Sequence, residues 1–102
     1  MEKINVLVVD DEEINLDLIE EIIRDDDTKI YKAKSGIEAL KLSTKREYAV
    51  IIIDANMPLM DGYELSKLLK KESKTKDIPV IFVTALQTKT NTYKAYKTGA
   101  ID

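Results

Sequence analysis

The sequence contains no cysteine, no histidine and no tryptophan, and it has only three glycines, two prolines and one phenylalanine. Without cysteine the chain has no disulfides, no thiolate metal sites and no cysteine nucleophile. Without histidine it has no imidazole base and lacks the usual zinc ligand. Any chemistry must therefore use carboxylates, hydroxyls, amines and a hard cation.

Long apolar runs are also absent. No segment approaches the roughly 18 to 20 apolar residues of a membrane span, and the N-terminus lacks the features of a signal peptide. With 102 residues and 44% hydrophobic content, we expect one domain over residues 1–102 with a single modest core. We also expect a cytoplasmic location and no membrane insertion.

The net charge of −3 conceals an uneven distribution of charged residues. Residues 1–27 carry 11 acidic and 2 basic side chains, whereas residues 28–102 carry 14 basic and 8 acidic ones. The acidic segment argues against direct binding to nucleic acid. The scattered lysines of the remainder are typical of a solvated surface.

Apolar runs of strand length alternate with segments of helical periodicity. The expected strands lie at residues 4–9, 29–33, 50–53 and 80–83. Two of the intervening helices begin with Ser or Asp followed three residues later by Glu, which is the pattern of a capping box. A fourth, weaker helix is expected at residues 90–98. This alternation predicts an α/β fold with a parallel, doubly wound sheet covered by helices on both faces.

The helix after the first strand has apolar residues at helical spacing, which predicts its buried face. These residues are Ile14, Leu18, Ile19, Ile22 and Ile23.

Three of the expected strands end in polar residues. Asp10 and Asp11 follow the first strand, Asp54 ends the third, and Thr84 follows the fourth. In a parallel sheet these ends meet at one edge, where ligands bind. Two carboxylates about 5 Å apart repel by about 3 kcal/mol at an effective dielectric of roughly 20, so either one is protonated or a cation lies among them. Since only oxygen ligands are available, we expect Mg²⁺.

A carboxylate beside Mg²⁺ at such an edge is a suitable phosphoryl acceptor, because phosphoryl transfer needs mainly positioning and charge neutralisation. In this hypothesis Asp54 is the nucleophile. Asp10 and Asp11 hold the cation, and the backbone carbonyl of Asn56 reaches it from the loop.

Two residues after the fourth strand complete the hypothesis. The hydroxyl of Thr84 would donate a hydrogen bond to a phosphoryl oxygen, and the small Ala85 would leave room for the group to enter. Taken singly, the polar residues of this hypothesis also have ordinary structural interpretations. Asp10 or Asp11 could cap the following helix, and Thr84 could be a satisfied strand-end hydroxyl.

Three motifs occur in a fixed order along the chain. They are Val8-Val9-Asp10-Asp11-Glu12, Asp54-Ala55-Asn56-Met57-Pro58-Leu59-Met60-Asp61-Gly62 and Val83-Thr84-Ala85. Together they closely resemble the receiver domain of two-component response regulators and hybrid sensor kinases. The resemblance implies a flavodoxin-like sheet with strand order 2-1-3-4. It also implies Mg²⁺-dependent phosphoryl transfer to Asp54 from the phosphohistidine of a sensor histidine kinase or phosphotransfer protein.

The resemblance further implies a signalling module that promotes its own phosphorylation and dephosphorylation and does not turn over an external substrate. In this family the threonine that matches Thr84 reorients toward the phosphoryl group and helps to pass the signal to an output surface, so the resemblance implies that phosphorylation switches such a surface. Receivers normally continue beyond the motif at Gly99 and Ala100 into a fifth strand, which bears an aromatic residue and a lysine, and a fifth helix. We therefore expect a C-terminally truncated receiver whose exposed strand at residues 80–83 allows homodimerisation or element exchange.

Two other functions fit part of the pattern. A phosphatase of the haloacid dehalogenase type uses an Asp-x-Asp motif, but the second position here is Asn56, whose amide cannot shuttle a proton. The alternative that stays open is a docking or dimerisation module of receiver fold that never uses a phosphoryl group.

Overall fold

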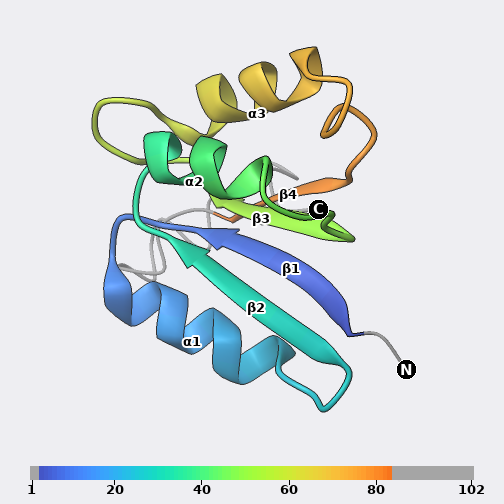
Figure 1. The fold of residues 1–102 in the computed structure, drawn as a ribbon. Helices are drawn as coiled ribbons and strands as arrows, with labels where there is room; N and C mark the ends of the chain where they lie inside the picture. The colour runs from blue at the N-terminus through green and yellow to red at the C-terminus, as the bar shows by residue number, and fades with distance from the viewer. Residues whose placement is uncertain (1–2, 84–102) are drawn as a thin grey trace.

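The computed structural model describes residues 3–83, which form a four-stranded parallel sheet with helices on both faces (Figure 1). The strand order is β2-β1-β3-β4, which confirms the predicted order and the flavodoxin-like fold. The elements are β1 (Ile4–Val9), α1 (Glu13–Ile23), β2 (Thr28–Ala33), α2 (Gly36–Ser43), β3 (Val50–Asp54), α3 (Gly62–Lys71) and β4 (Val80–Val83). The helix expected at residues 90–98 lies outside the described residues.

The core consists of two layers, one on each face of the sheet. Successive strand residues point to opposite faces, so Leu7 and Val9 pack with α2 and α3 while Val6 and Val8 pack with α1. Figure 1 shows this arrangement, with α2 and α3 above the sheet and α1 below it. Because both faces of β1 and β3 are covered, these strands are nearly continuous runs of branched apolar residues.

The predicted capping box of α3 is present in full. The Asp61 carboxylate accepts a hydrogen bond from the Glu64 backbone N–H at 2.9 Å, and the Glu64 carboxylate accepts one from the Asp61 N–H at 3.1 Å. In α2 only half of the box forms. Ser35 caps the N–H of Glu38, but the Glu38 carboxylate accepts from the N–H of Lys34.

The predicted buried face of α1 is largely wrong. Three of its residues are exposed: Ile14 by 74%, Leu18 by 47% and Ile22 by 72%. The inward face consists of Asn15, Leu16 and Ile19, with Ile23 partly buried against the same core layer. The helix carries two apolar rows, and the sheet covers only the row that brings Asn15 next to Asp10.

The strand register determines which residues meet at the carboxyl edge of the sheet. Val9 lies opposite Ile53 in the β1–β3 pair, and Asp54 lies opposite Val83 in the β3–β4 pair. Asp10 and Asp54 therefore come directly after Val9 and Ile53, which lie opposite each other in the β1–β3 pair. β4 is half-buried in the described part of the chain, and the expected dimer contact through this strand stays a prediction. Among residues 3–83, no helix has the length and apolar character needed to cross a membrane.

Candidate functional site

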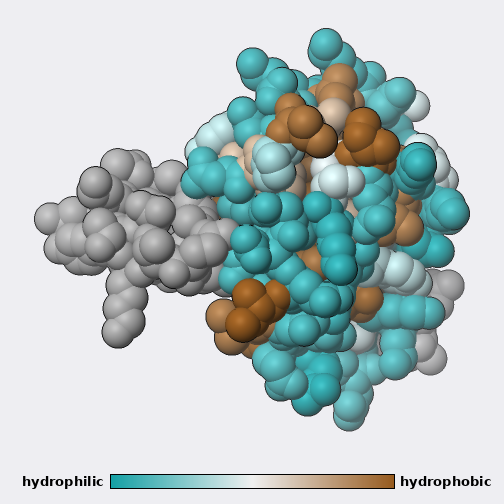
Figure 2. All heavy atoms as spheres, turned by 90° about the vertical axis from the view of Figure 1, so that its left-hand side faces the viewer, coloured by the Kyte–Doolittle hydropathy of each residue, from teal (hydrophilic) through white to brown (hydrophobic). Residues whose placement is uncertain are grey.

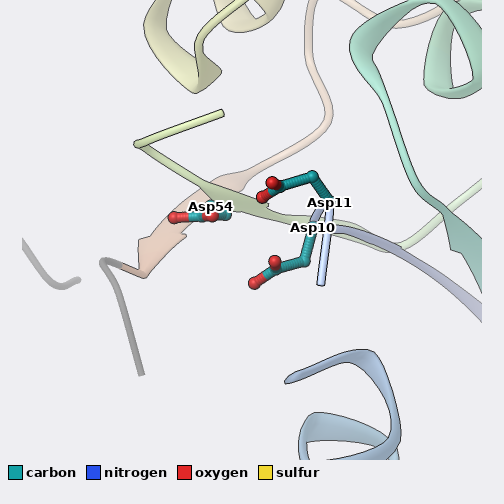
Figure 3. Close-up of side chains that lie close together, drawn as sticks. All are labelled: Asp10, Asp11 and Asp54. Atoms are coloured by element: carbon teal, nitrogen blue, oxygen red, sulfur yellow. The ribbon is translucent and has the colours of Figure 1, made fainter. Parts of the chain in front are cut away.

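Three carboxylates converge where β1 and β3 end. Asp10 and Asp11 come directly after β1, and Asp54 is the last residue of β3. One carboxylate oxygen from each residue lies within 4.8 Å of the corresponding oxygens of the other two. Figure 3 shows the Asp10 and Asp11 side chains extending from the end of β1 toward the side on which Asp54 lies. The structure thus brings together the three acidic residues that were predicted from the sequence.

Asp10 is almost completely buried, with 1% of its surface exposed. Its Oδ1 accepts hydrogen bonds from the Glu12 backbone N–H at 2.9 Å and from the Asn15 side-chain amide at 3.4 Å. Burial raises the pKa of Asp10 above its ordinary value, and the negative charges of Asp11 and Glu12 raise it further. The two hydrogen bonds oppose this shift but do not cancel it.

Asp54 is the most deeply buried of the three, with no exposed surface. Its Oδ1 accepts a hydrogen bond from the Asn56 backbone N–H at 3.1 Å. Asn56 itself is exposed and follows the strand by two residues. The structure therefore places Asn56 beside the Asp54 carboxylate, while the role of its carbonyl as a metal ligand stays a prediction.

The loop after Asp54 is held against the end of β3 by close backbone contacts. The N–H of Gly62 donates to the carbonyl oxygen of Ala55 at 3.1 Å. A Cβ added at Gly62 would lie 2.3 Å from the carbonyl oxygen of Asp54, so only glycine allows this approach. Within this loop Leu59 is fully exposed and adopts a left-handed conformation with φ of 69°.

A cation fits the charge and donor pattern of this site. The Oδ1 atom of Asp11 is buried and has no hydrogen-bond partner among residues 3–83. In the same part of the chain no lysine or arginine forms an ion pair with Asp10 or Asp11, and Lys34 pairs with Glu13 at 3.2 Å instead. The three carboxylates supply oxygen ligands, the type of ligand that Mg²⁺ prefers. The site therefore meets the requirements of a hard divalent cation.

Two predicted site residues cannot be compared with the geometry. Thr84 and Ala85 lie outside the described residues, although Val83, directly before them, is paired with Asp54. One residue at the site was missed by the reasoning from sequence. Asn15 is buried beside Asp10, but a polar residue between apolar ones on an amphipathic helix gave no signal of its own.

Comparison with known proteins agrees with this geometry. The family model of the response regulator receiver domain matches residues 6–102. This chain belongs to the response regulator receiver domain family. Receiver domains are signalling modules of two-component systems, and the acidic cluster of this receiver is compatible with Mg²⁺ binding.

Individual relatives support the assignment. The receiver is 36% identical to the probable transcriptional regulator ycf29 of Porphyra purpurea over 95 residues, which covers 93% of this chain but only 46% of that protein. It is 34% identical to the polar-differentiation response regulator DivK of Brucella ovis, over 83% of this chain and 69% of DivK. Among solved structures, chemotaxis protein CheY4 of Vibrio cholerae matches with a TM-score of 0.76 and 29% identity, over 97% of this chain and 82% of CheY4.

Proposed function

We propose that this receiver accepts a phosphoryl group on Asp54 from the phosphohistidine of a sensor histidine kinase or phosphotransfer protein, in a step that depends on Mg²⁺. The observation that carries the proposal is the meeting of Asp10, Asp11 and Asp54 within 4.8 Å at the carboxyl edge of the sheet. A single helix cap would need only one of these acids.

Asp54 supplies the nucleophile. One of its carboxylate oxygens attacks the phosphorus, the bond between phosphorus and the histidine nitrogen breaks, and that nitrogen keeps the bonding electron pair. The Asn56 N–H hydrogen bond to Oδ1 fixes the orientation of the carboxylate for this attack. The burial of Asp54 limits the access of water to the acyl phosphate that forms.

Asp10, Asp11, Asp54 and the backbone carbonyl of Asn56 would hold Mg²⁺, which when bound would neutralise the negative charge of the carboxylates and the phosphoryl oxygens. The hydroxyl of Thr84 would donate a hydrogen bond to a phosphoryl oxygen. Ala85 would keep the entrance open.

The exposed apolar row of α1 is a candidate surface for binding the phosphodonor protein. Ile14, Leu18 and Ile22 are spaced four residues apart and lie on the solvent side of the helix. The row starts four residues after Asp10, so a protein that binds it is close to the acidic site. Figure 2 shows the face toward which the strands point, with hydrophobic patches separated by hydrophilic surface and one patch in its lower half, at the level of α1. An apolar helix with basic flanks fits this row, because Asp17 and Glu21 lie beside it. Their side chains stay 63% and 64% exposed within their ion pairs with Lys32 and Arg24.

Intact mass spectrometry after incubation with acetyl phosphate and Mg²⁺ tests the phosphoryl transfer. We expect the wild-type protein to gain one phosphoryl group, and Asp54→Asn to gain none. Asp61→Asn is the matched control, because it changes a carboxylate in the same loop to another good helix cap and should leave the mass gain intact.

Two outcomes would contradict the proposal. A mass gain that survives in D54N would place the acceptor elsewhere. A folded wild-type protein that gains no phosphoryl group would favour the docking module of receiver fold, which does not use phosphorylation.

A further inference from the structure

One buried amide has no role in the proposed phosphoryl transfer. Asn15 lies in the first turn of α1, on the inward face of the helix, with 4% of its surface exposed. Its neighbours on that face, Leu16 and Ile19, are apolar. Burying an amide costs free energy unless the amide is hydrogen-bonded. The hydrogen-bond partner of Asn15 therefore indicates why an amide is buried at this position.

That partner is Asp10. The Asn15 Nδ2 group donates to Asp10 Oδ1 at 3.4 Å, and the Glu12 N–H donates to the same oxygen at 2.9 Å. Within residues 3–83, the other oxygen, Oδ2, accepts no hydrogen bond from the protein. Two donors on one oxygen fix the rotation of the carboxylate and leave the second oxygen for a ligand.

We propose that Asn15 is a positioning residue that orients Asp10 for Mg²⁺ binding. This inference rests on the proposed function, since it assumes that the acidic cluster binds Mg²⁺. A neutral donor suits this task because it holds the carboxylate without cancelling its charge. A lysine or arginine in the same place would compete with the cation.

The size of the expected effect follows from the geometry. Loss of a group that hydrogen-bonds a metal ligand from outside the coordination sphere typically weakens metal binding about 10- to 100-fold. The bond from Asn15 is long, and the Glu12 N–H remains when Asn15 is replaced. We therefore expect a loss of about 10-fold, the lower end of that range.

Isothermal titration calorimetry, which measures the Kd for Mg²⁺ of the wild type and of Asn15→Leu, tests the proposal. Leucine has a similar size and suits a buried helical position, but it cannot donate a hydrogen bond. Asn15→Ser is the second variant, because the serine hydroxyl is too short to reach Asp10 and the change adds no apolar side chain. The matched control is Thr75→Val, which removes another buried donor, the Thr75 hydroxyl bonded to the Leu69 carbonyl oxygen, far along the chain from the acids.

The prediction is that N15L and N15S bind Mg²⁺ about 10-fold more weakly than wild type, while T75V lowers the melting temperature without changing the Kd. The backbone amide resonance of Glu12 should shift in both Asn15 variants and not in T75V, because Glu12 donates to the same Asp10 oxygen.

Unchanged Mg²⁺ affinity in both Asn15 variants, with the wild type binding normally, would overturn the role of Asn15 and leave the proposed function standing. A folded wild type that does not bind Mg²⁺ would instead overturn both proposals.

Discussion

Asp10→Asn removes one of the three charges at the strand ends while it keeps the shape of the side chain. The asparagine oxygen can still accept the hydrogen bonds from Glu12 and Asn15. Because the carboxylate oxygens lie within 4.8 Å of one another, each ionised pair repels by about 3 kcal/mol at an effective dielectric of roughly 20. Asp11 is only half-buried, and the solvent near it reduces this repulsion. We expect D10N to raise the free energy of unfolding of the metal-free protein at neutral pH by about 2 kcal/mol.

The pH dependence of the stability difference between D10N and wild type provides a second test of the same prediction. The folded protein raises the pKa of Asp10 above the ordinary value of 3.8, chiefly through burial. As the pH falls, Asp10 is protonated in the folded protein before it is protonated in the unfolded chain. Asp10 therefore favours folding at low pH, and this contribution to stability is lost as the pH rises through the pKa of the folded state. The stability difference between D10N and wild type should therefore be large at neutral pH. It should disappear as the pH falls toward 3.8.

Thermal and urea unfolding in EDTA measure the difference. For a domain of this size, 2 kcal/mol corresponds to about 8–16 °C in melting temperature. Added Mg²⁺ should stabilise the wild type and not D10N, because D10N has lost a ligand. Asp77→Asn is the control: it removes an exposed carboxylate and should change the free energy of unfolding by less than about 0.5 kcal/mol. A D10N protein less stable than wild type in EDTA at neutral pH would refute the reasoning from charge repulsion.

Two further predictions concern exposed apolar residues. Leu18→Glu places a charge in the exposed row of α1, so it should slow phosphoryl transfer from a histidine kinase about 10-fold or more while phosphorylation by acetyl phosphate stays unchanged; equal rates with the kinase would exclude this row as the docking surface. Leu59→Gly should raise the free energy of unfolding by about 0.5–1 kcal/mol in urea denaturation, because Leu59 is exposed and has a φ of 69° that glycine adopts without strain. A less stable L59G would show that the leucine side chain makes a stabilising contact.

The sheet and the acidic cluster were predictable because both follow from local patterns and one topological rule. The run at residues 50–53 is apolar throughout and the run at residues 4–9 is apolar except for Asn5, as expected of strands covered on both faces. Parallel pairing then brings their carboxyl ends together, so Asp10 and Asp54 meet without any further information. The loop geometry could not be predicted in the same way. Leucine rarely has a positive φ, so nothing in the sequence indicates that Leu59 adopts one, in a tight turn closed by a hydrogen bond from the Met60 N–H to the Pro58 carbonyl oxygen at 2.7 Å.

The orientation of α1 could not be predicted because hydrophobic periodicity does not distinguish its two apolar rows. One row contains Ile14, Leu18 and Ile22, and the other contains Leu16, Ile19 and Ile23. Either row could cover a sheet face of similar area, so burial of apolar surface leaves the rotation of the helix nearly undetermined.

Polar contacts at the carboxyl ends of β1 and β2 select between these rows. At the end of β1, Asn15 donates to Asp10 only when Leu16 and Ile19 face inward. On the β2 side, Lys32 pairs with Asp17 at 3.0 Å and with Glu20, and Lys34 pairs with Glu13. These ion pairs are partly exposed and individually weak, but all of them favour the same rotation. The rotation that completes the environment of Asp10 is therefore also the one that leaves Ile14, Leu18 and Ile22 on the surface, as the row that we propose binds the phosphodonor protein.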